Sequence, residues 1–231
     1  MEKRVYAVIG ASRGIGLEFV SQLVSNGHHV IATARDPEKN AALQELLKSS
    51  GDRLSVHALD CTNGESVKKF AKAIEGHGID VLINNAGVNA EGGSKLREQD
   101  FAQVLAVLNT NAVGPMRITA ALLPNLKKSK GAKLINISSK MGSFADNFSG
   151  GSYSYRMSKV ALNMFNKSFM FEEPDVISVV VHPGWVKTDM GGSAAPLTPA
   201  KSVDGMLKLI DGLKLQDSGR FYEYSGKEIA W

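Results

Sequence analysis

The feature that most constrains the fold of this chain is a regular alternation of short apolar runs with amphipathic stretches. The apolar runs, interpreted as strands, are Val5–Ile9, His29–Ala34, Leu54–Leu59, Asp80–Asn84, Lys133–Ser138, Ile177–Val181 and Arg220–Tyr224. Such an alternation is typical of a parallel sheet covered by helices on both faces. The sequence therefore predicts an α/β fold with a doubly wound, mostly parallel, seven-stranded sheet.

Helical stretches connect the apolar runs. A first helix should carry Phe19 and Leu23 on its apolar face, and later helices are expected over Pro37–Lys48, Gly64–Glu75, Glu98–Leu123, Ser152–Glu173 and Pro199–Leu213. The helix that begins near Glu98 should stop at Leu123, because Pro124 follows. No repeat or long linker interrupts the alternation, so residues 1–231 are predicted to form a single domain.

Composition bears on several classes of function. The chain is 43% hydrophobic and 22% charged, as soluble globular proteins are. Val5–Ile9 is too short for a membrane span or a signal-peptide core, and the single Cys61 fits a reducing compartment, so we expect a cytoplasmic protein. The net charge of +4 is modest and no aromatic residues interleave with the lysine clusters, which argues against nucleic-acid binding. The five histidines lack metal-binding spacing, so no metal is predicted.

A glycine loop follows the first apolar run. Gly10, Gly14 and Gly16 lie between a predicted strand and a predicted helix, where a glycine pattern is more specific than elsewhere. Such a loop lets the backbone approach a pyrophosphate, whose charge meets the free N–H groups of the helix start. The alternative is that these glycines serve only a tight turn.

The end of the second apolar run indicates which dinucleotide the chain binds. NAD sites tend to place an acid at this position for the ribose 2′-hydroxyl, whereas arginine suits a 2′-phosphate. Here Ala34 occupies the acid's expected place and Arg35 follows it, while Arg13 in the glycine loop could reach the same phosphate. Asp36 is the counter-evidence, because a small shift would let it serve NAD. The pattern favours NADP(H).

Tyr155 and Lys159 are four residues apart in the predicted helix Ser152–Glu173. Residues at that spacing lie side by side on one helix face. A nearby ammonium favours the phenolate and lowers a tyrosine pKa, which would suit Tyr155 to proton transfer near neutral pH. Tyr153 is the rival in the same segment, but Met157 follows it at that spacing. An ordinary surface helix with a Tyr and a Lys remains the alternative.

Five motifs occur in order along the chain: Gly10-Ala11-Ser12-Arg13-Gly14-Ile15-Gly16, Asn84-Asn85-Ala86-Gly87, Asn136-Ile137-Ser138-Ser139, Tyr155-x-x-x-Lys159 and Pro183-Gly184-x-x-x-Thr188. In this order they resemble the short-chain dehydrogenase/reductase family, and the match covers nearly the whole chain. Tyr153–Arg156, His182–Gly192 and Ala230–Trp231 are similar to the C-factor/sniffer-type carbonyl reductases within that family. The resemblance implies a Rossmann-like fold and a homodimer or homotetramer.

The resemblance also implies roles for individual residues. Tyr155 would exchange the proton with the carbonyl oxygen, Lys159 would lower the Tyr155 pKa, and Ser139 would hold the substrate oxygen. Asn111 would anchor a water that links Lys159 to solvent. The cofactor contacts implied by the family motifs are Gly10, Ser12, Arg13, Gly14, Ile15, Gly16, Arg35, Asp60, Asn85, Ala86, Gly87, Tyr155, Lys159, Pro183, Gly184, Val186 and Thr188.

Several of these assignments have rivals in the sequence. Ser138 and Ser139 face opposite ways on a strand, so one of them is structural, and family order favours Ser139. Asn109 competes with Asn111, although the glycine three residues after Asn111 fits the family better. Asp60, assigned to the adenine, could instead cap the next helix.

The chain departs from the family at two places. Ile9 stands where the family usually has a threonine whose hydroxyl could brace the glycine turn. The interval between Ser139 and Tyr155 is longer than usual, and its extra residues, within 144–151, are expected to form a loop over the active site.

Apolar residues near these motifs suggest the substrate. The loop and the segment after Gly184 would supply substrate contacts from Met141, Phe144, Phe148, Trp185 and Met190, together with Ser139 and Tyr155. We therefore predict an NADPH-dependent oxidoreductase that reduces a small apolar aldehyde, ketone or quinone. The alternatives are an NADP-binding sensor or signalling protein on the same fold and an NAD-linked alcohol dehydrogenase.

Overall fold

Seven parallel strands form one sheet. The computed structural model describes residues 3–90 and 95–231, and its strands are β1 (Val5–Ile9), β2 (His29–Ala34), β3 (Leu54–Ala58), β4 (Val81–Asn84), β5 (Lys133–Ile137), β6 (Ile177–His182) and β7 (Phe221–Glu223). Their order across the sheet is β3-β2-β1-β4-β5-β6-β7, and each neighbouring pair is parallel. The predicted Rossmann-like sheet is confirmed, with every pairing parallel.

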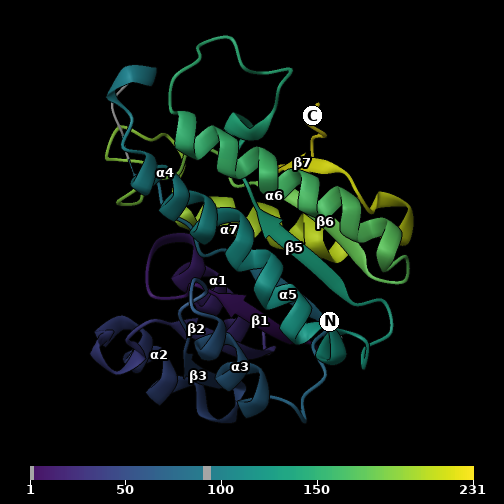
Figure 1. Ribbon diagram of the computed structural model, residues 1–231. Coiled ribbons are helices and arrows are strands. Elements are labelled where there is room, and N and C mark those ends of the chain that lie inside the picture. The colour runs from purple at the N-terminus through teal and green to yellow at the C-terminus, as the bar shows by residue number, and fades with distance from the viewer. Residues whose placement is uncertain (1–2, 91–94) are drawn as a thin grey trace.

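Helices cover both faces of this sheet (Figure 1). They are α1 (Gly14–Ser25), α2 (Ala41–Ser50), α3 (Gly64–Ala73), α4 (Phe101–Leu108), α5 (Gly114–Leu126), α6 (Tyr153–Glu172) and α7 (Pro199–Gly212). Apolar residues of α1, α2 and α7 join the core on one face, whereas those of α3, α5 and α6 join the core on the other. Helix α4 packs beside α6.

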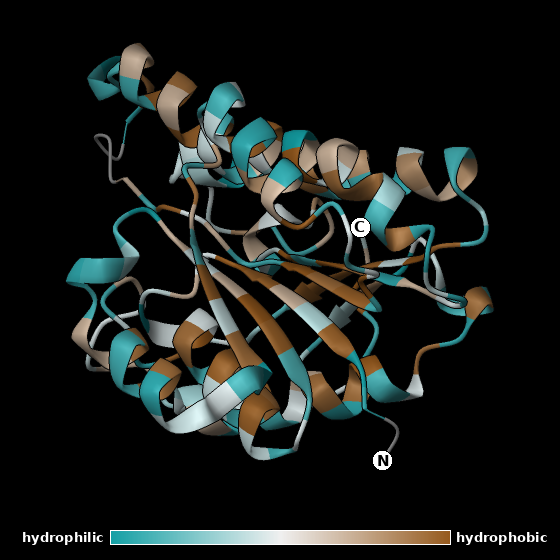
Figure 2. Cartoon of the chain, turned by 90° about the horizontal axis from the view of Figure 1, so that it is seen from below, coloured by the Kyte–Doolittle hydropathy of each residue, from teal (hydrophilic) through white to brown (hydrophobic). Residues whose placement is uncertain are grey.

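Alternation along the strands creates the two cores. In β1, Tyr6 and Val8 belong to one apolar cluster, and Ala7 and Ile9 belong to the other. All four are almost fully buried, as expected for a strand covered on both faces. Figure 2 shows the resulting pattern, with hydrophobic strands between helices whose hydrophobic residues turn inward.

The predicted helix over Glu98–Leu123 is wrong in detail. The chain instead forms α4, a π-helical turn over Asn109–Val113, and then α5, which continues past Pro124 to Leu126. Pro124 lies in the last turn of α5, where it cannot bond the carbonyl four residues earlier, yet the helix continues for two more residues. The π turn widens the helix where Asn111 is buried, a feature that often marks a functional site.

The strand order fixes where a ligand can bind. The chain moves outward from β1 to β3, then returns to place β4 on the other side of β1. The connections after β1 and β4 therefore diverge to opposite sides of the sheet. In open α/β sheets, ligands bind at such a switch point, beyond the carboxyl ends of the strands.

Candidate active site

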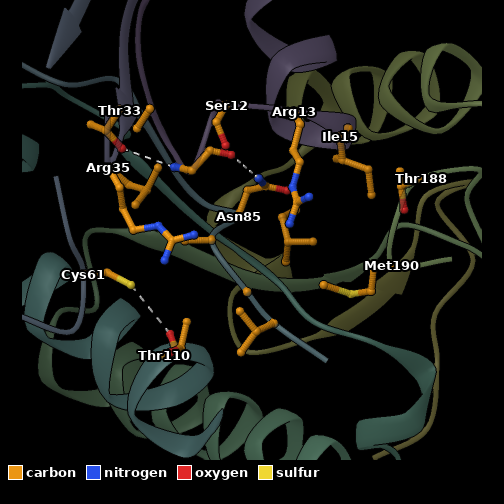
Figure 3. A pocket seen from close by; sticks show the side chains of 18 of the residues that line it. Ser12, Arg13, Ile15, Thr33, Arg35, Cys61, Asn85, Thr110, Thr188 and Met190 are labelled. Atoms are coloured by element: carbon orange, nitrogen blue, oxygen red, sulfur yellow. Dashed lines mark hydrogen bonds between the residues drawn. The ribbon is translucent and has the colours of Figure 1, made fainter. Parts of the chain in front are cut away.

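A cavity of about 710 Å³ lies at this switch point. Its wall is built from the segments that follow β1 to β6 and from α6 (Figure 3). Of the residues predicted from the sequence, it includes Gly10, Ser12, Arg13, Gly14, Ile15, Arg35, Asp60, Asn85, Ala86, Gly87, Tyr155, Lys159, Pro183, Thr188 and Met190. Residues from six separate segments of the chain thus meet at one cavity.

Close packing requires glycine at two positions of the loop after β1. A Cβ on Gly16 would lie 2.0 Å from the Gly10 carbonyl oxygen, and Gly10 itself has a φ of +83°. The Asn85 amide donates to the same carbonyl, with Nδ2 2.7 Å from the oxygen. Asn85 therefore fastens the glycine loop as well as lining the cavity.

The N-terminus of α1 opens toward the cavity. Arg13 occupies the cap position, and its side chain makes no capping hydrogen bond. The first N–H groups of an α-helix have no partner within the helix, so they attract anions. The amides at the start of α1 are therefore suited to a pyrophosphate.

Thr33, which sequence reasoning missed, braces the glycine turn. Its Oγ1 accepts a hydrogen bond from the Gly10 N–H at 3.2 Å, and the side chain is almost fully buried. Ile9, which stands where the family usually has threonine, points into the core instead. The hydroxyl lost at Ile9 is thus replaced from the neighbouring strand β2, a substitution that only the strand pairing reveals.

The two arginines predicted to choose the cofactor both reach the cavity (Figure 3). Arg35 follows β2 directly and is exposed, whereas Asp36 is not among the described lining residues. Arg13 already has a partner, because its Nη1 lies 2.7 Å from Oδ2 of Asp189. Asp189, which sequence analysis did not single out, lines the cavity as well.

Tyr155, Lys159 and Ser139 converge where α6 meets the end of β5. The Lys159 ammonium lies 5.5 Å from the centre of the Tyr155 ring and donates to the Ile137 carbonyl at 3.0 Å. The Ser139 hydroxyl lies near the Tyr155 hydroxyl and acts to lower its pKa. The helical spacing therefore brings the two side chains together as predicted, and Ser139 joins them from a distant part of the sequence.

Burial is the main cause of the pKa shifts of Lys159 and Tyr155. It lowers the pKa of Lys159 from its ordinary value to about 8. Burial also raises the pKa of Tyr155, an effect that the neighbouring Ser139 hydroxyl opposes but does not cancel. The prediction that Lys159 lowers the Tyr155 pKa is therefore wrong in its net direction for this structure, because desolvation of the phenolate outweighs the favourable groups around it.

Ser138 and Ser139 divide their roles as their alternation on the strand requires. The Ser138 hydroxyl donates to Oδ1 of Asn163 at 2.8 Å, which ties β5 to α6. Asn163 also donates to the Gly142 carbonyl at 2.9 Å. Ser138 lines the cavity, but its hydroxyl is held by Asn163, whereas Ser139 is not among the described lining residues and lies near Tyr155.

Asn111 lies fully buried in the π turn. Its side chain accepts from the Val88 N–H at 2.8 Å, and it donates to the Val88 carbonyl and to the Ser158 hydroxyl. Ser158 in turn donates to the Tyr155 carbonyl at 2.7 Å. Asn111 therefore braces the first turns of α6. Asn109 lies nearby and accepts from Arg117 at 3.3 Å.

Asp60 does not cap the helix that follows it. That role belongs to Asn63, whose Oδ1 accepts from the N–H groups of Glu65 and Ser66. The Asp60 carboxylate accepts two hydrogen bonds from Thr62, which lower its pKa below the ordinary value. Asp60 lines the cavity, and its contact with the adenine stays a prediction.

The other predicted substrate residues stand apart from the cavity. Its described wall includes Tyr155 and Met190 but not Ser139, Met141, Phe144, Phe148 or Trp185. Phe144 and Phe148 are 74% and 90% exposed, and the Trp185 indole donates to the Gly191 carbonyl at 2.7 Å. Their role in substrate binding stays a prediction.

Three predicted cofactor residues also lie behind the cavity wall rather than in it. Gly16 packs under the glycine loop, and Val186 is buried. A Cβ on Gly184 would lie 2.7 Å from a Leu197 methyl group. Each supports a segment that does line the cavity.

The comparison with known families agrees with this site. Residues 4–197 match the family model for short chain dehydrogenase. The chain belongs to the short chain dehydrogenase family. It is 44% identical to the C-signal protein of Myxococcus xanthus over 71% of this chain and all of that protein.

Solved structures of two carbonyl reductases of this family are similar along their whole length. One is the NADPH-bound carbonyl reductase from chicken fatty liver, with 38% identity, a TM-score of 0.92 and complete coverage of both chains. The other is the carbonyl reductase Sniffer of D. melanogaster, with 33% identity, a TM-score of 0.94 and the same coverage. This short chain dehydrogenase is therefore an oxidoreductase by family.

In residues 3–90 and 95–231, no three His, Cys, Asp or Glu side chains converge in a way that could hold a metal ion. Across the same residues, no helix combines the length and the apolar composition that a membrane crossing needs.

Proposed function

We propose that this short chain dehydrogenase uses NADPH to reduce the carbonyl group of a small apolar aldehyde, ketone or quinone to an alcohol. The observation that carries the proposal is the cluster of Tyr155, Lys159 and Ser139, whose Tyr155 and Lys159 line a cavity that starts at a glycine loop. A hydroxyl pair with an adjacent ammonium is suited to holding an oxygen and passing it a proton. The NADPH-bound chicken carbonyl reductase has the same fold.

The residues present fit a dinucleotide that carries an additional phosphate. The uncapped start of α1 would hold the pyrophosphate, while Gly10 and Gly16 keep the backbone close to it. Arg13 and Arg35 would bind the 2′-phosphate, because arginine forks match phosphate geometry. Asp60 would contact the adenine and Thr188 the carboxamide, with Ser12, Ile15, Asn85, Ala86, Gly87, Pro183, Gly184 and Val186 forming or supporting the rest of the site.

Each reactive side chain then has one task. When bound, the reduced nicotinamide supplies the hydride to the carbonyl carbon. Tyr155 donates its proton to the carbonyl oxygen, which Ser139 holds by a hydrogen bond. Lys159 stabilises the phenolate that Tyr155 becomes, and Asn111 keeps α6 in place while anchoring the water that returns the proton. No metal takes part in this scheme.

The substrate should be apolar near its reacting carbon. Met190 lines the cavity near Thr188, whereas Met141, Phe144, Phe148 and Trp185 are outside its described wall and belong to the two segments that the sequence predicts to contact the substrate. Apolar walls with few polar groups are usual for small-molecule sites. An aldehyde, ketone or quinone with an apolar body fits this arrangement.

We further propose a single-domain, cytoplasmic protein that forms a homodimer or homotetramer. The lone, buried Cys61 is consistent with a reducing compartment. Large apolar side chains that are more than half exposed lie on α4, α5 and α6, namely Phe101, Leu105, Met116, Met164 and Phe171. Light scattering after size exclusion would test the oligomer, since a second copy covering these helices would double the mass of the monomer.

A signalling protein is the second candidate, because the C-signal protein of Myxococcus xanthus is 44% identical to this chain. Binding of a dinucleotide without turnover would favour that candidate. The cluster of Tyr155, Lys159 and Ser139 favours catalysis, since binding alone does not require a proton donor.

One experiment separates the candidates. Oxidation of NADPH and NADH would be followed with a panel of carbonyl compounds, and the reverse reaction with alcohols and NAD. Tyr155→Phe should lower kcat by about 10²- to 10⁴-fold. Tyr153→Phe is the matched control, because Tyr153 is exposed and has no lysine at the same spacing. Unchanged turnover in Tyr155→Phe would contradict the mechanism, and preference for NADH would contradict the cofactor assignment.

A further inference from the structure

The Arg156 side chain ties together both ends of the 140–151 segment, the loop between Ser139 and α6. Its Nη1 donates to the Met141 carbonyl at 3.4 Å, and its Nε donates to the Gly150 carbonyl at 3.2 Å. Its Nη2 donates to the Ser149 hydroxyl at 2.9 Å. One guanidinium thus engages three groups of the loop, a geometry that the rigid fork of arginine permits and a lysine cannot reproduce.

The Met141 contact leads directly to the proposed reacting groups. The Met141 N–H donates to the Ser139 hydroxyl oxygen at 3.2 Å, and the Ser139 hydroxyl lies near that of Tyr155, whose pKa it acts to lower. Because Ser139 accepts from Met141, its own proton is left free to point toward an oxygen. The contacts close a ring, since Tyr155 and Arg156 are neighbours in the chain.

The chain enters α6 through an uncommon conformation beside this ring. Gly150, Gly151 and Ser152 all have positive φ values, +60°, +66° and +44°. Such values suit glycine, but they are strained for Ser152. The Arg156 bonds to Gly150 and Ser149 hold the segment that leads into this turn.

A second set of contacts secures the middle of the loop independently of Arg156. The Ser143 hydroxyl donates to the Ala230 carbonyl at 2.6 Å, and the Ala145 N–H donates to the Trp231 carbonyl at 3.1 Å. The Trp231 ring also stacks on Phe221, with 5.5 Å between centroids. Loss of the Arg156 fork should therefore release the two ends of the 140–151 segment without unfolding it.

We propose that Arg156 is a positioning residue, which orients the Ser139 hydroxyl for the substrate oxygen by holding the Met141 peptide. This inference rests on the proposed function. Arg156 is not among the described residues that line the cavity, so its loss should leave cofactor binding intact. It acts only through Ser139, and the two residues should therefore be coupled in their effects on the rate.

The test compares Arg156→Gln and Arg156→Lys with the wild type in carbonyl reduction. Both variants should lower kcat/KM about tenfold, because small misplacements of a reacting group are costly, while the NADPH Kd stays within about twofold. In a Ser139→Ala background, Arg156→Gln should cause no further loss. Arg4→Gln is the matched control, since Arg4 directly precedes β1 and pairs with Asp211 at the amino ends of the strands, whereas the cavity lies at their carboxyl ends. Equal losses in both backgrounds, or a loss no larger than that of Arg4→Gln, would overturn the proposal.

Amide hydrogen exchange gives a readout that does not depend on turnover. Exchange over residues 140–151 should become faster in Arg156→Gln, and exchange in β1 and β4 should not change. If the wild type reduced no carbonyl, the proposed function would fail, and the exchange measurement would still decide whether Arg156 holds the loop. Unchanged exchange over residues 140–151 would overturn the inference in either case.

Discussion

The Arg13 guanidinium lies 2.7 Å from the Asp189 carboxylate, so an ion pair links the glycine loop to the segment after β6 beside the cavity. Both side chains are about three-quarters exposed, at 73% and 74%. An exposed pair of this kind stabilises a fold by roughly 0–1 kcal/mol, which is little enough for a phosphate to replace it. If Arg13 binds the cofactor 2′-phosphate as proposed, Asp189 would compete with that phosphate for Arg13.

Replacing Asp189 with Asn should lower the Kd for NADPH by about 1.5- to 5-fold. This factor corresponds to the free energy of the surface ion pair that the ligand would no longer have to break. The unfolding free energy should change by less than about 1 kcal/mol. Fluorescence titration would give the Kd values. NADH, which lacks the 2′-phosphate, is the control ligand and should bind as before. Weaker NADPH binding in Asp189→Asn would contradict the assignment of Arg13.

Lys159 should make the cofactor-free protein more stable as the pH rises above about 8. Burial lowers the folded-state pKa of Lys159 to about 8, whereas that of an unfolded lysine is about 10.4. Between these values the unfolded chain binds more protons, so the stability contribution of this group increases with pH. Below pH 8 Lys159 is protonated in both the folded and the unfolded chain, so burial of its charge destabilises the folded state to the full extent.

Urea denaturation of the wild type and Lys159→Met would measure this effect. The difference between their unfolding free energies should shift by roughly 2 kcal/mol in favour of the wild type between pH 7 and pH 9.5. The subtraction removes the contribution of other titrating groups. A constant difference across this range would show that Lys159 titrates as an ordinary lysine.

Replacement by alanine should have different effects at Ser138 and Ser139. Ser139→Ala should lower kcat/KM by about 10²-fold, as removal of one hydrogen bond to a reacting oxygen does elsewhere. Ser138→Ala should instead lower the unfolding free energy by about 1–3 kcal/mol, because Oδ1 of buried Asn163 loses its donor. Kinetics and urea denaturation of both variants would check this prediction. A large activity loss in Ser138→Ala with a stability loss in Ser139→Ala would show that Ser138 is the reacting serine and Ser139 the structural one.

Gly142 should not tolerate a side chain. A Cβ there would lie 2.9 Å from Cβ of Lys159 and 3.0 Å from Nδ2 of Asn163. Gly142→Ala should therefore cost about 1–3 kcal/mol of stability and reduce activity by displacing Lys159. Gly212→Ala is the control, since it ends α7 with no atom within 4 Å of the added Cβ, and it should be neutral or stabilising by up to about 1 kcal/mol. Similar losses in both variants would show that Gly142 has no special packing role.

Much of the fold could be predicted because its signals are local. The two-residue alternation in strands such as Val5–Ile9 and the helical periodicity of Tyr153–Glu172 are set by side chains that each element must bury. The four-residue spacing of Tyr155 and Lys159 placed them together because a helix leaves no other arrangement. The break at Asn109–Val113 was missed, since a π turn has no comparable sequence pattern.

Other features depend on contacts between distant segments. Thr33 supplies the hydroxyl missing at Ile9 only because β2 pairs with β1. The pKa of Lys159 depends on how deeply the finished fold buries it, which spacing along the helix does not reveal. Phe144 and Phe148 look like pocket residues in the sequence, yet the loop directs them to solvent.

Periodicity and motif order were thus sufficient for the parallel sheet, the glycine loop and the pairing of Tyr155 with Lys159, because each follows from the geometry of one or two neighbouring elements. Long-range packing decided which serine faces Tyr155, which partner Arg13 takes and how Arg156 holds the 140–151 segment. These outcomes depend on distances between atoms far apart in the chain. Those distances are set only when both helical layers close on the sheet.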